Sequence, residues 1–180
     1  MHPDIQSVLF TQAQIAAKAE ELACAITKDY QGKSPVLIGV LKGSFIFMAD
    51  LARHVDLPCE VDFMAVSSYG NKSQTTGAVR ILKDLDSDVE GRDIIVVEDI
   101  LDSGVTLSYI MNVMQSRHPS SVTICTLLDK PERRRAPVQA RYTGFATPDE
   151  FVVGYGLDYA GRYRNLPYIG VLKREVYEDR

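Results

Sequence analysis

The chain has 180 residues, of which 46% are hydrophobic and 24% are charged, as in an ordinary soluble globular protein of one domain. Its formal net charge of −4 argues against a surface that binds nucleic acid regardless of sequence. The three cysteines are scattered, which argues against a disulfide framework or a structural zinc site, and no segment has the pattern of a signal peptide or a membrane span. We therefore expect a cytoplasmic protein.

The N-terminal region predicts a helix, then a buried strand. Thr11 and Gln14 have the spacing of a capping box, so the helix is expected to begin there. Residues 35–41 form an apolar run typical of a buried strand, and the turn after it carries Lys42 and Gly43. A lysine beside a helix N-terminus suits a diphosphate, although a solvated loop charge is the more frequent role of such a lysine.

A second helix and two strands follow this turn. The helix is expected to bury Phe45 and Met48 on one face. Residues 60–66 alternate between polar and apolar, as in a strand with one wetter face, and residues 78–82 predict its neighbour. The polar residues 67–77 between them predict a hairpin loop.

The most informative segment begins with a buried strand over residues 94–97. Glu98 and Asp99 follow, at the edge where open α/β sheets bind their ligands. A turn with Ser103 and Gly104 then leads into an amphipathic helix. Helix N-termini offer unpaired N–H groups to anions, and adjacent carboxylates need a cation or hydroxyl donors nearby. The residues predict a phosphate cradle beside a metal or sugar site; the alternative is an acidic turn capping an ordinary βα unit.

The last third of the chain contains one more buried strand, at residues 121–128. Lys130 follows it, and by itself reads as a surface residue before a loop stiffened by proline. The run Arg133-Arg134-Arg135 is interpreted as a solvated surface run. Phe151 begins a segment with a Gly-x-Gly pattern, which is a weak signal when taken alone.

Taken together, the run from the strand through Glu98-Asp99 and Asp102-Ser103-Gly104 to Thr106 resembles the phosphoribosyl diphosphate (PRPP) loop of the type I phosphoribosyltransferases. Lys42, Lys130 and the segment after residue 151 extend the resemblance over roughly residues 35–172, toward the hypoxanthine-guanine branch of that family. The resemblance implies an α/β fold with a mostly parallel twisted sheet and helices on both faces. It also implies a single domain, residues 1–180, with a small hood formed by the N-terminal segment and about residues 130–180.

The resemblance assigns roles residue by residue. Asp102 would be the general base near the purine N7. The PRPP site would comprise Glu98, Asp99, Ile100, Leu101, Ser103, Gly104, Val105 and Thr106, with the two acids toward the ribose hydroxyls. Pyrophosphate would contact Lys42, Gly43 and Arg164, and the base would contact Lys130, Phe151, Val152 and Asp158. The ligands of Mg²⁺ would include Glu98, Asp99 and Asp158. Ser68 and Tyr69 resemble part of the mobile lid of the family. Many relatives carry a basic residue at position 105, so with Val105 phosphate binding would rest on backbone amides and hydroxyls.

The implied reaction transfers the 5-phosphoribosyl group from PRPP to N9 of hypoxanthine or guanine and releases pyrophosphate, in a homodimer or homotetramer. Two alternatives stay open. One is a regulatory PRPP-fold protein that binds RNA, such as the attenuators of pyrimidine operons, which needs a basic face and leaves Lys130 and Phe151 without a role. The other is a nucleotide-binding α/β domain without transferase activity.

Overall fold

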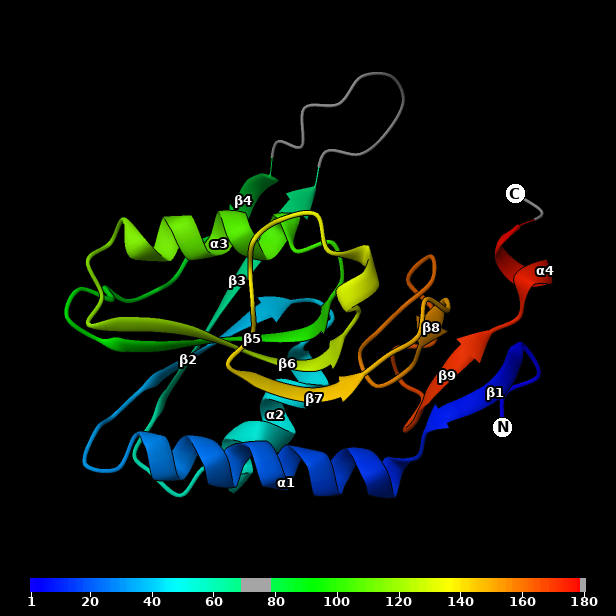
Figure 1. Ribbon diagram of the computed structural model, residues 1–180, viewed down its shortest axis with the longest axis horizontal. Coiled ribbons are helices and arrows are strands. Elements are labelled where there is room, and N and C mark those ends of the chain that lie inside the picture. Colours follow the sequence, from blue (N-terminus) through cyan, green and yellow to red (C-terminus); the bar gives the residue numbers. More distant parts are fainter. Residues whose placement is uncertain (69–78, 179–180) are drawn as a thin grey trace.

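The computed structural model describes residues 1–68 and 79–178, which form two β-sheets and their helices (Figure 1). The elements occur in the order β1 Ile5–Phe10, α1 Gln12–Asp29, β2 Val36–Leu41, α2 Phe45–His54, β3 Glu60–Ser68, β4 Val79–Lys83, β5 Asp93–Leu101, α3 Val105–Gln115, β6 Ser121–Asp129, the 3₁₀ helix Pro131–Arg133, β7 Tyr142–Ala146, β8 Val152–Val153, β9 Ile169–Leu172 and α4 Arg174–Tyr177. None of the described helices is both long enough and apolar enough to cross a membrane.

The larger sheet has the strand order β4-β3-β2-β5-β6-β7. Only β4 runs antiparallel to its neighbour, and the other pairs are parallel. Helix α3 lies on one face of this sheet, and α1 and α2 lie on the other (Figure 1). The expected fold, a mostly parallel sheet with helices on both faces, is confirmed.

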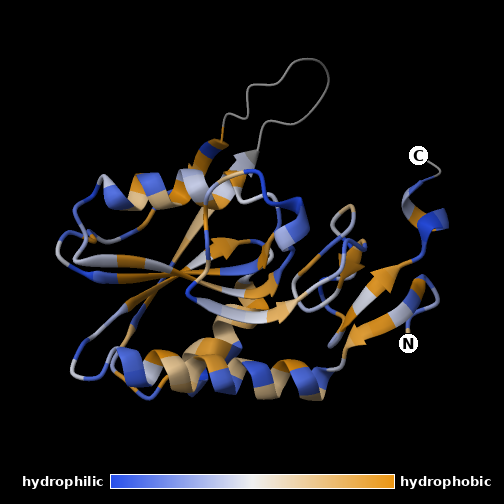
Figure 2. Ribbon diagram, viewed as in Figure 1, coloured by the Kyte–Doolittle hydropathy of each residue, from blue (hydrophilic) through white to orange (hydrophobic). Residues whose placement is uncertain are grey.

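Strand β5 lies at the centre of the core because all four residues of its apolar run are fully buried. Successive side chains of a strand point to opposite faces. Ile95 and Val97 therefore pack toward α1 and α2, whereas Ile94 and Val96 pack toward α3. Figure 2 shows the same apolar strands enclosed between helices with polar outer faces. Each such side chain contributes about 1.5–3 kcal/mol through burial, so this strand is held rigidly.

The N-terminal helix has the capping box that the sequence predicts, with the Gln14 N–H donating to Thr11 Oγ1 at 3.3 Å. The expected face of α2 was wrong in part. Met48 is buried, but Phe45 is 43% exposed. The buried stripe starts one residue earlier, at Ser44, whose hydroxyl donates to the Val40 carbonyl at 2.7 Å. A stripe that starts there continues with Phe47, Met48 and Leu51, which are the buried residues of α2.

The smaller sheet, called the hood sheet from here on, has the order β1-β9-β8 and is antiparallel. Its strands come from both ends of the described chain, and Ile5 pairs with Leu172. Ile5, Val153, Tyr163 and Leu172 form its own small core. Gly154 and Gly156 follow β8 at φ +102 each, and a Cβ on Gly156 would lie 2.0 Å from the Gly43 carbonyl oxygen. The hood therefore contacts the loop after β2 directly.

The loop predicted over residues 67–77 begins later than expected, because β3 continues through Ser67 and Ser68. Ser68 is the last residue of that strand, and Tyr69 belongs to residues 69–78, which lie outside the described part of the chain. The lid stays a prediction.

Candidate active site

Three loops meet at one edge of the larger sheet because β2, β5 and β6 are adjacent and parallel. The strand over residues 94–97 continues further than predicted, to Leu101, which pairs with Asp129 of β6. Glu98 and Asp99 therefore lie within β5 and not in the loop after it. The continued ladder with β6 explains the difference, since pairing partners override the weak strand preference of acidic residues.

The turn after β5 forms a small cradle at the N-terminus of α3. Gly104 has φ +78, and as the N-cap residue it has no side chain that could cap this helix. The Val105 N–H donates to Ser103 Oγ at 3.5 Å, and the other N–H groups of the first turn are available to an anion. A cavity of about 120 Å³ lies here, lined by Glu98, Ile100, Leu101, Asp102, Ser103, Gly104, Thr106 and Leu107. Val105 is 39% exposed and does not line it, so at the N-terminus of α3 the polar groups of the cradle are backbone groups and the hydroxyls of Ser103 and Thr106.

We expect Gly104→Ala to abolish tight PRPP binding and to destabilise the fold. The left-handed conformation costs an L-residue about 1–2 kcal/mol, and a Cβ here would lie 2.5 Å from Val138 Cγ1. Gly91→Ala is the matched control, because Gly91 has φ +68 with open space around it. Calorimetric titration with PRPP and thermal unfolding measure both effects; equal losses in the two variants would show that only backbone strain matters.

Glu98 and Asp99 place two acidic groups in a poorly solvated position. Burial, with the neighbouring Asp99 carboxylate, raises the pKa of Glu98 well above its usual range. Burial also raises the pKa of Asp99 to about 6, although Arg164 lowers it in part. Gly43 packs directly on the Asp99 carboxylate, since a Cβ there would lie 1.7 Å from Oδ2. The pair carries negative charge that the described residues compensate only in part.

For this reason Asp99→Asn should stabilise the ligand-free protein at pH 7.5, by on the order of 2 kcal/mol. The folded state of the wild type retains the proton up to about pH 6 and the unfolded state only up to 3.8, so wild-type stability falls as pH rises through that window. The gain in stability of Asp99→Asn over the wild type should therefore vanish below pH 4. Thermal unfolding of both proteins at pH 7.5 and below pH 4 measures it.

Asp93→Asn is the control of opposite sign. Burial pushes the pKa of Asp93 upward, but hydrogen bonds from Ser121 and Lys33 leave it below 3.8. This variant should lose stability at pH 7.5, and the loss should shrink as pH falls through the lowered pKa. If Asp99→Asn were less stable than the wild type at pH 7.5, the conclusion that the buried charge of Asp99 destabilises the ligand-free protein would be wrong.

The candidate pyrophosphate residues come from two elements that touch. Lys42 is exposed in the loop after β2, and Gly43 of that loop contacts Gly156 of the hood segment. Arg164 approaches from the same segment, with Nη1 donating to the Gly156 carbonyl at 2.5 Å and Nη2 lying 2.6 Å from Asp158 Oδ1. Of these residues, Gly43 and Arg164 lie near the Asp99 carboxylate.

The carboxylates assigned to Mg²⁺ do not form one compact cluster. Asp158 is engaged by Arg164 and by the Gly161 N–H, and no group of three metal-ligating side chains occurs in residues 1–68 and 79–178. Mg²⁺ is usually held by one or two carboxylates together with substrate phosphates and water. The undercompensated pair of Glu98 and Asp99 fits that kind of site, completed by a phosphorylated substrate.

A larger cavity of about 320 Å³ opens beside the cradle. It is lined by Ile100, Asp102, Lys130, Arg133, Asp149, Glu150, Phe151, Val152, Leu157 and Tyr177. Lys130 is buried at its wall, and Nζ donates to the Glu150 carbonyl at 2.6 Å. Burial lowers the pKa of Lys130, while Asp102 opposes the shift. An ammonium group has three N–H donors, so two remain for a ligand.

Aromatic rings form one side of this cavity. Phe151 is 38% exposed, and Tyr177 of α4 stacks on it with 4.9 Å between ring centroids and 23° between planes. Tyr159 meets Phe151 edge to face at 5.6 Å. Sequence reasoning missed Tyr177, because a tyrosine in a short terminal helix carries no pattern. Of the predicted base-binding residues, Lys130, Phe151 and Val152 line the cavity, whereas Asp158 lies beside Arg164.

Asp102 lies between the two cavities and lines both. Its Oδ1 atom is buried and has no hydrogen-bond partner among the residues that the structure describes. Arg133 Nε lies 3.3 Å away, in an orientation that makes an ion pair without a hydrogen bond. A buried polar atom without a partner is rare and often marks a functional position. Asp102 Oδ1 is thus available to accept a hydrogen bond from a ligand.

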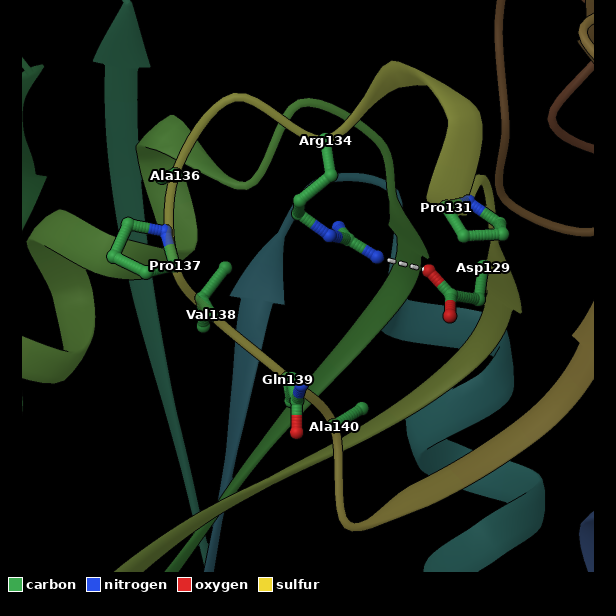
Figure 3. Close-up of a pocket in the computed structure, with 8 residues that line it drawn as sticks. All are labelled: Asp129, Pro131, Arg134, Ala136, Pro137, Val138, Gln139 and Ala140. Carbon is green, nitrogen blue, oxygen red and sulfur yellow. Dashed lines mark hydrogen bonds and ion pairs between the residues drawn. The ribbon is translucent and has the colours of Figure 1, made fainter.

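The interpretation of the arginine run as solvated was wrong for Arg134, whose side chain is 19% exposed, whereas Arg133 and Arg135 are exposed as predicted. Arg133 contacts the carboxylates of Asp102 and Asp149, and Arg134 pairs with Asp129 (Figure 3). Only the Arg135 side chain is exposed without an ion pair among the described residues. The 3₁₀ helix at Pro131–Arg133 turns the chain back toward the loop after β5, and this turn explains why Arg134 is not solvated.

Comparison with known proteins agrees with this geometry. Residues 6–160 match the model of the phosphoribosyl transferase domain. A hypoxanthine-guanine phosphoribosyltransferase of Bacillus subtilis is 56% identical over 179 residues, covering 99% of both chains. The crystal structure of a hypoxanthine phosphoribosyltransferase from Staphylococcus aureus superimposes with a TM-score of 0.95 at 53% identity, covering 98% of this chain and 96% of that one. The chain therefore belongs to the phosphoribosyl transferase domain family, and within it to the hypoxanthine-guanine phosphoribosyltransferases.

Proposed function

We propose that this protein transfers the 5-phosphoribosyl group of PRPP to N9 of hypoxanthine or guanine, giving IMP or GMP and pyrophosphate. The observation that carries the proposal is the position of Asp102, whose unpartnered oxygen lies between a phosphate-sized cradle and a cavity large enough for a purine. The similarity to hypoxanthine-guanine phosphoribosyltransferases over the whole chain supports the same reaction.

In the proposed reaction the 5-phosphate binds the N-terminus of α3, through the backbone of Ser103 and Gly104 and the hydroxyl of Thr106. The purine N9 lone pair forms the new bond to C1′ while the bond to pyrophosphate breaks and takes its electron pair with it. Asp102 accepts the proton from N7. Positive charge develops on the ribose as pyrophosphate leaves, and the carboxylates of Glu98 and Asp99 stabilise it.

The purine binds in the cavity of about 320 Å³. Lys130 donates a hydrogen bond to the exocyclic 6-oxygen, and Phe151 stacks on the ring. Backbone carbonyls near Val152 and Asp158 face the 2-position. Mg²⁺, held by Glu98, Asp99 and the substrate phosphates with Asp158 nearby, would neutralise the leaving pyrophosphate. Lys42, Gly43 and Arg164 would contact the same group.

The proposal also covers the cellular location and the oligomeric state of the protein. Three free cysteines at Cys24, Cys59 and Cys125 suit the reducing cytoplasm. We propose a homodimer or homotetramer, as the family resemblance implies, and light scattering of the purified protein decides between these states. Nucleic acid and membranes are not expected partners.

A direct assay tests the reaction. PRPP and Mg²⁺ are incubated with hypoxanthine, guanine, xanthine or adenine, and pyrophosphate release and nucleotide absorbance are followed together. Equal rates of the two signals with the 6-oxopurines are expected. Pyrophosphate release without nucleotide, or neither signal, would overturn the proposal.

The regulatory RNA-binding alternative is not favoured. It needs a basic face, and the arginine run that was the one candidate is partly neutralised, because Arg133 and Arg134 pair with aspartates. A filter-binding assay with pyrimidine-operon leader RNA would show retention if that alternative held.

A further inference from the structure

We infer that Arg134 is a positioning residue. It holds the backbone of the proposed PRPP-binding loop, residues 102–104, from the side away from the phosphate cradle. This inference rests on the proposed function, which makes Asp102 and the following residues the reacting edge of that loop. Residues 131–140 form a segment that follows β6, here called the brace (Figure 3). Several of its contacts reach the loop that holds Asp102, Ser103 and Gly104.

The brace binds the carbonyl groups of the loop. Arg134 Nη1 donates to the Asp102 carbonyl oxygen at 2.8 Å. The N–H groups of Arg135 and Ala136 donate to the Ser103 carbonyl oxygen at 2.8 and 3.1 Å. A peptide plane whose C=O points one way directs its N–H the opposite way. Holding both carbonyls toward the brace therefore turns the following N–H groups toward the phosphate cradle.

The side chain of Arg134 is itself held in place. Its Nη2 pairs with the carboxylate of Asp129, the last residue of β6, and both side chains are largely buried, at 19% and 23% exposure. A planar guanidinium presents several donors in fixed directions, so one side chain can reach a carbonyl and a carboxylate at once. Arg134 thus ties the PRPP-type loop to the rigid end of the neighbouring strand.

Packing fixes the same position. A Cβ on Gly104 would lie 2.5 Å from Val138 Cγ1 and 3.1 Å from Arg134 Cδ, so the brace touches the turn without a gap. A cavity of about 500 Å³ opens on the other side, lined by Asp129, Pro131, Arg134 and residues 136–140. Water can enter that cavity, so the loop carbonyls would have a competing partner if Arg134 were removed.

Arg134→Met tests the inference, with Arg135→Met as the matched control. Both remove one positive charge from the brace, but the Arg135 side chain is exposed, and its backbone N–H stays in place. Arg134→Met should raise KM for PRPP about tenfold and lower kcat about tenfold, typical of losing a charge-assisted hydrogen bond, while KM for the purine stays within twofold. Arg135→Met should change none of these by more than twofold.

Hydrogen exchange gives a readout that does not depend on catalysis. In the ligand-free protein, the peptide covering residues 102–106 should exchange faster in Arg134→Met than in the wild type, and Arg135→Met should match the wild type. Arg134→Lys serves as a second variant if Arg134→Met does not fold, because lysine keeps the charge and cannot make both contacts; it should show the same loss in PRPP affinity.

The outcomes are distinguishable. A wild-type protein that does not release pyrophosphate from PRPP would overturn the proposed function, and hydrogen exchange would still decide whether Arg134 braces the loop. Unchanged exchange at residues 102–106 in Arg134→Met, or an equal rise of both KM values with a lowered midpoint of thermal unfolding, would overturn the positioning role.

Discussion

Asp102→Asn should lower kcat by on the order of a hundredfold or more while KM for PRPP changes little, as expected when a general base is lost and the phosphate site is kept. The substitution preserves the shape of the side chain, and the loop contacts of residue 102 with Arg134 and of Ser103 with the brace use backbone atoms. Steady-state kinetics with hypoxanthine, at saturating PRPP and Mg²⁺, measures the effect.

Asp149→Asn is a useful comparison for this variant. Arg133 forms ion pairs with both Asp102 and Asp149. Asp149→Asn therefore removes the other carboxylate partner of Arg133 and leaves the loop at residues 102–104 unchanged. We expect its kcat to fall less than tenfold. If Asp102→Asn lost PRPP affinity and kept its turnover at saturation, Asp102 would belong to PRPP binding and another group would accept the proton.

Lys130→Ala should narrow the preference for 6-oxopurines over adenine, which the wild type should discriminate by roughly 10⁴-fold in kcat/KM. The buried ammonium group matches the 6-oxo group of hypoxanthine, guanine and xanthine. Adenine presents an amino group there, and unpaired donors in a closed site cost about 1–3 kcal/mol. Measuring kcat/KM for hypoxanthine, guanine and adenine gives the ratio directly.

Two further variants separate recognition from packing. Lys130→Met keeps the aliphatic stem and should lose the same selectivity as Lys130→Ala. Phe151→Ala should weaken all purines alike, since every purine offers a π-face to the ring. Unchanged base selectivity in both Lys130 variants would move the specificity determinant elsewhere and leave Lys130 as a structural residue.

The sequence predicted the parts of the fold that depend on local patterns. The β-branched run Ile94–Val97 indicated a strand buried on both faces, and the observed alternate packing of its side chains explains why that pattern was informative. Thr11 and Gln14 indicated the start of α1, and Ser103 and Gly104 indicated the turn before α3. In each case the physical cause lies within a few residues.

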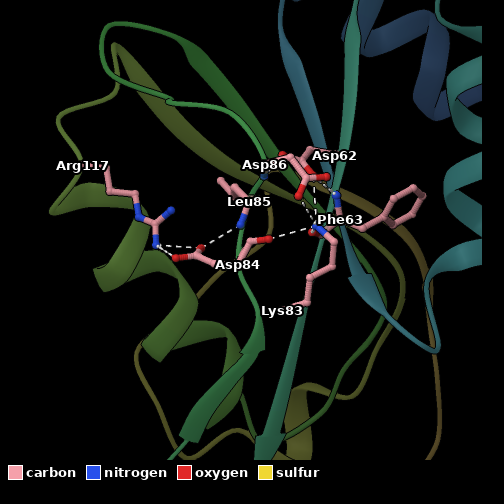
Figure 4. Close-up of polar contacts among 7 residues, drawn as sticks. All are labelled: Asp62, Phe63, Lys83, Asp84, Leu85, Asp86 and Arg117. Atoms are coloured by element: carbon pink, nitrogen blue, oxygen red, sulfur yellow. Dashed lines mark hydrogen bonds and ion pairs between the residues drawn. The ribbon is translucent and has the colours of Figure 1, made fainter.

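Contacts between distant segments could not be predicted in this way. Tyr177 reaches Phe151 from the last helix, and Arg134 reaches the backbone of Asp102 across 32 positions. The contacts of Lys83 are a further example (Figure 4). Its ammonium group donates to the Phe63 carbonyl at 2.9 Å and lies 3.2 Å from Asp86 Oδ1. A lysine at the end of a strand has many possible partners, and only the folded chain selects among them.

The pairing of Ile5 with Leu172 sets an order of events during translation. The hood sheet cannot close until residue 172 has left the ribosome, whereas β2, β5, β6, the loop after β5 and the brace are complete by residue 140. Contacts between distant residues also form slowly, because the entropy of closing a long loop must be overcome first. A nascent chain would thus form the proposed phosphate cradle before the proposed purine cavity, and truncation near the C-terminus should impair purine selection first.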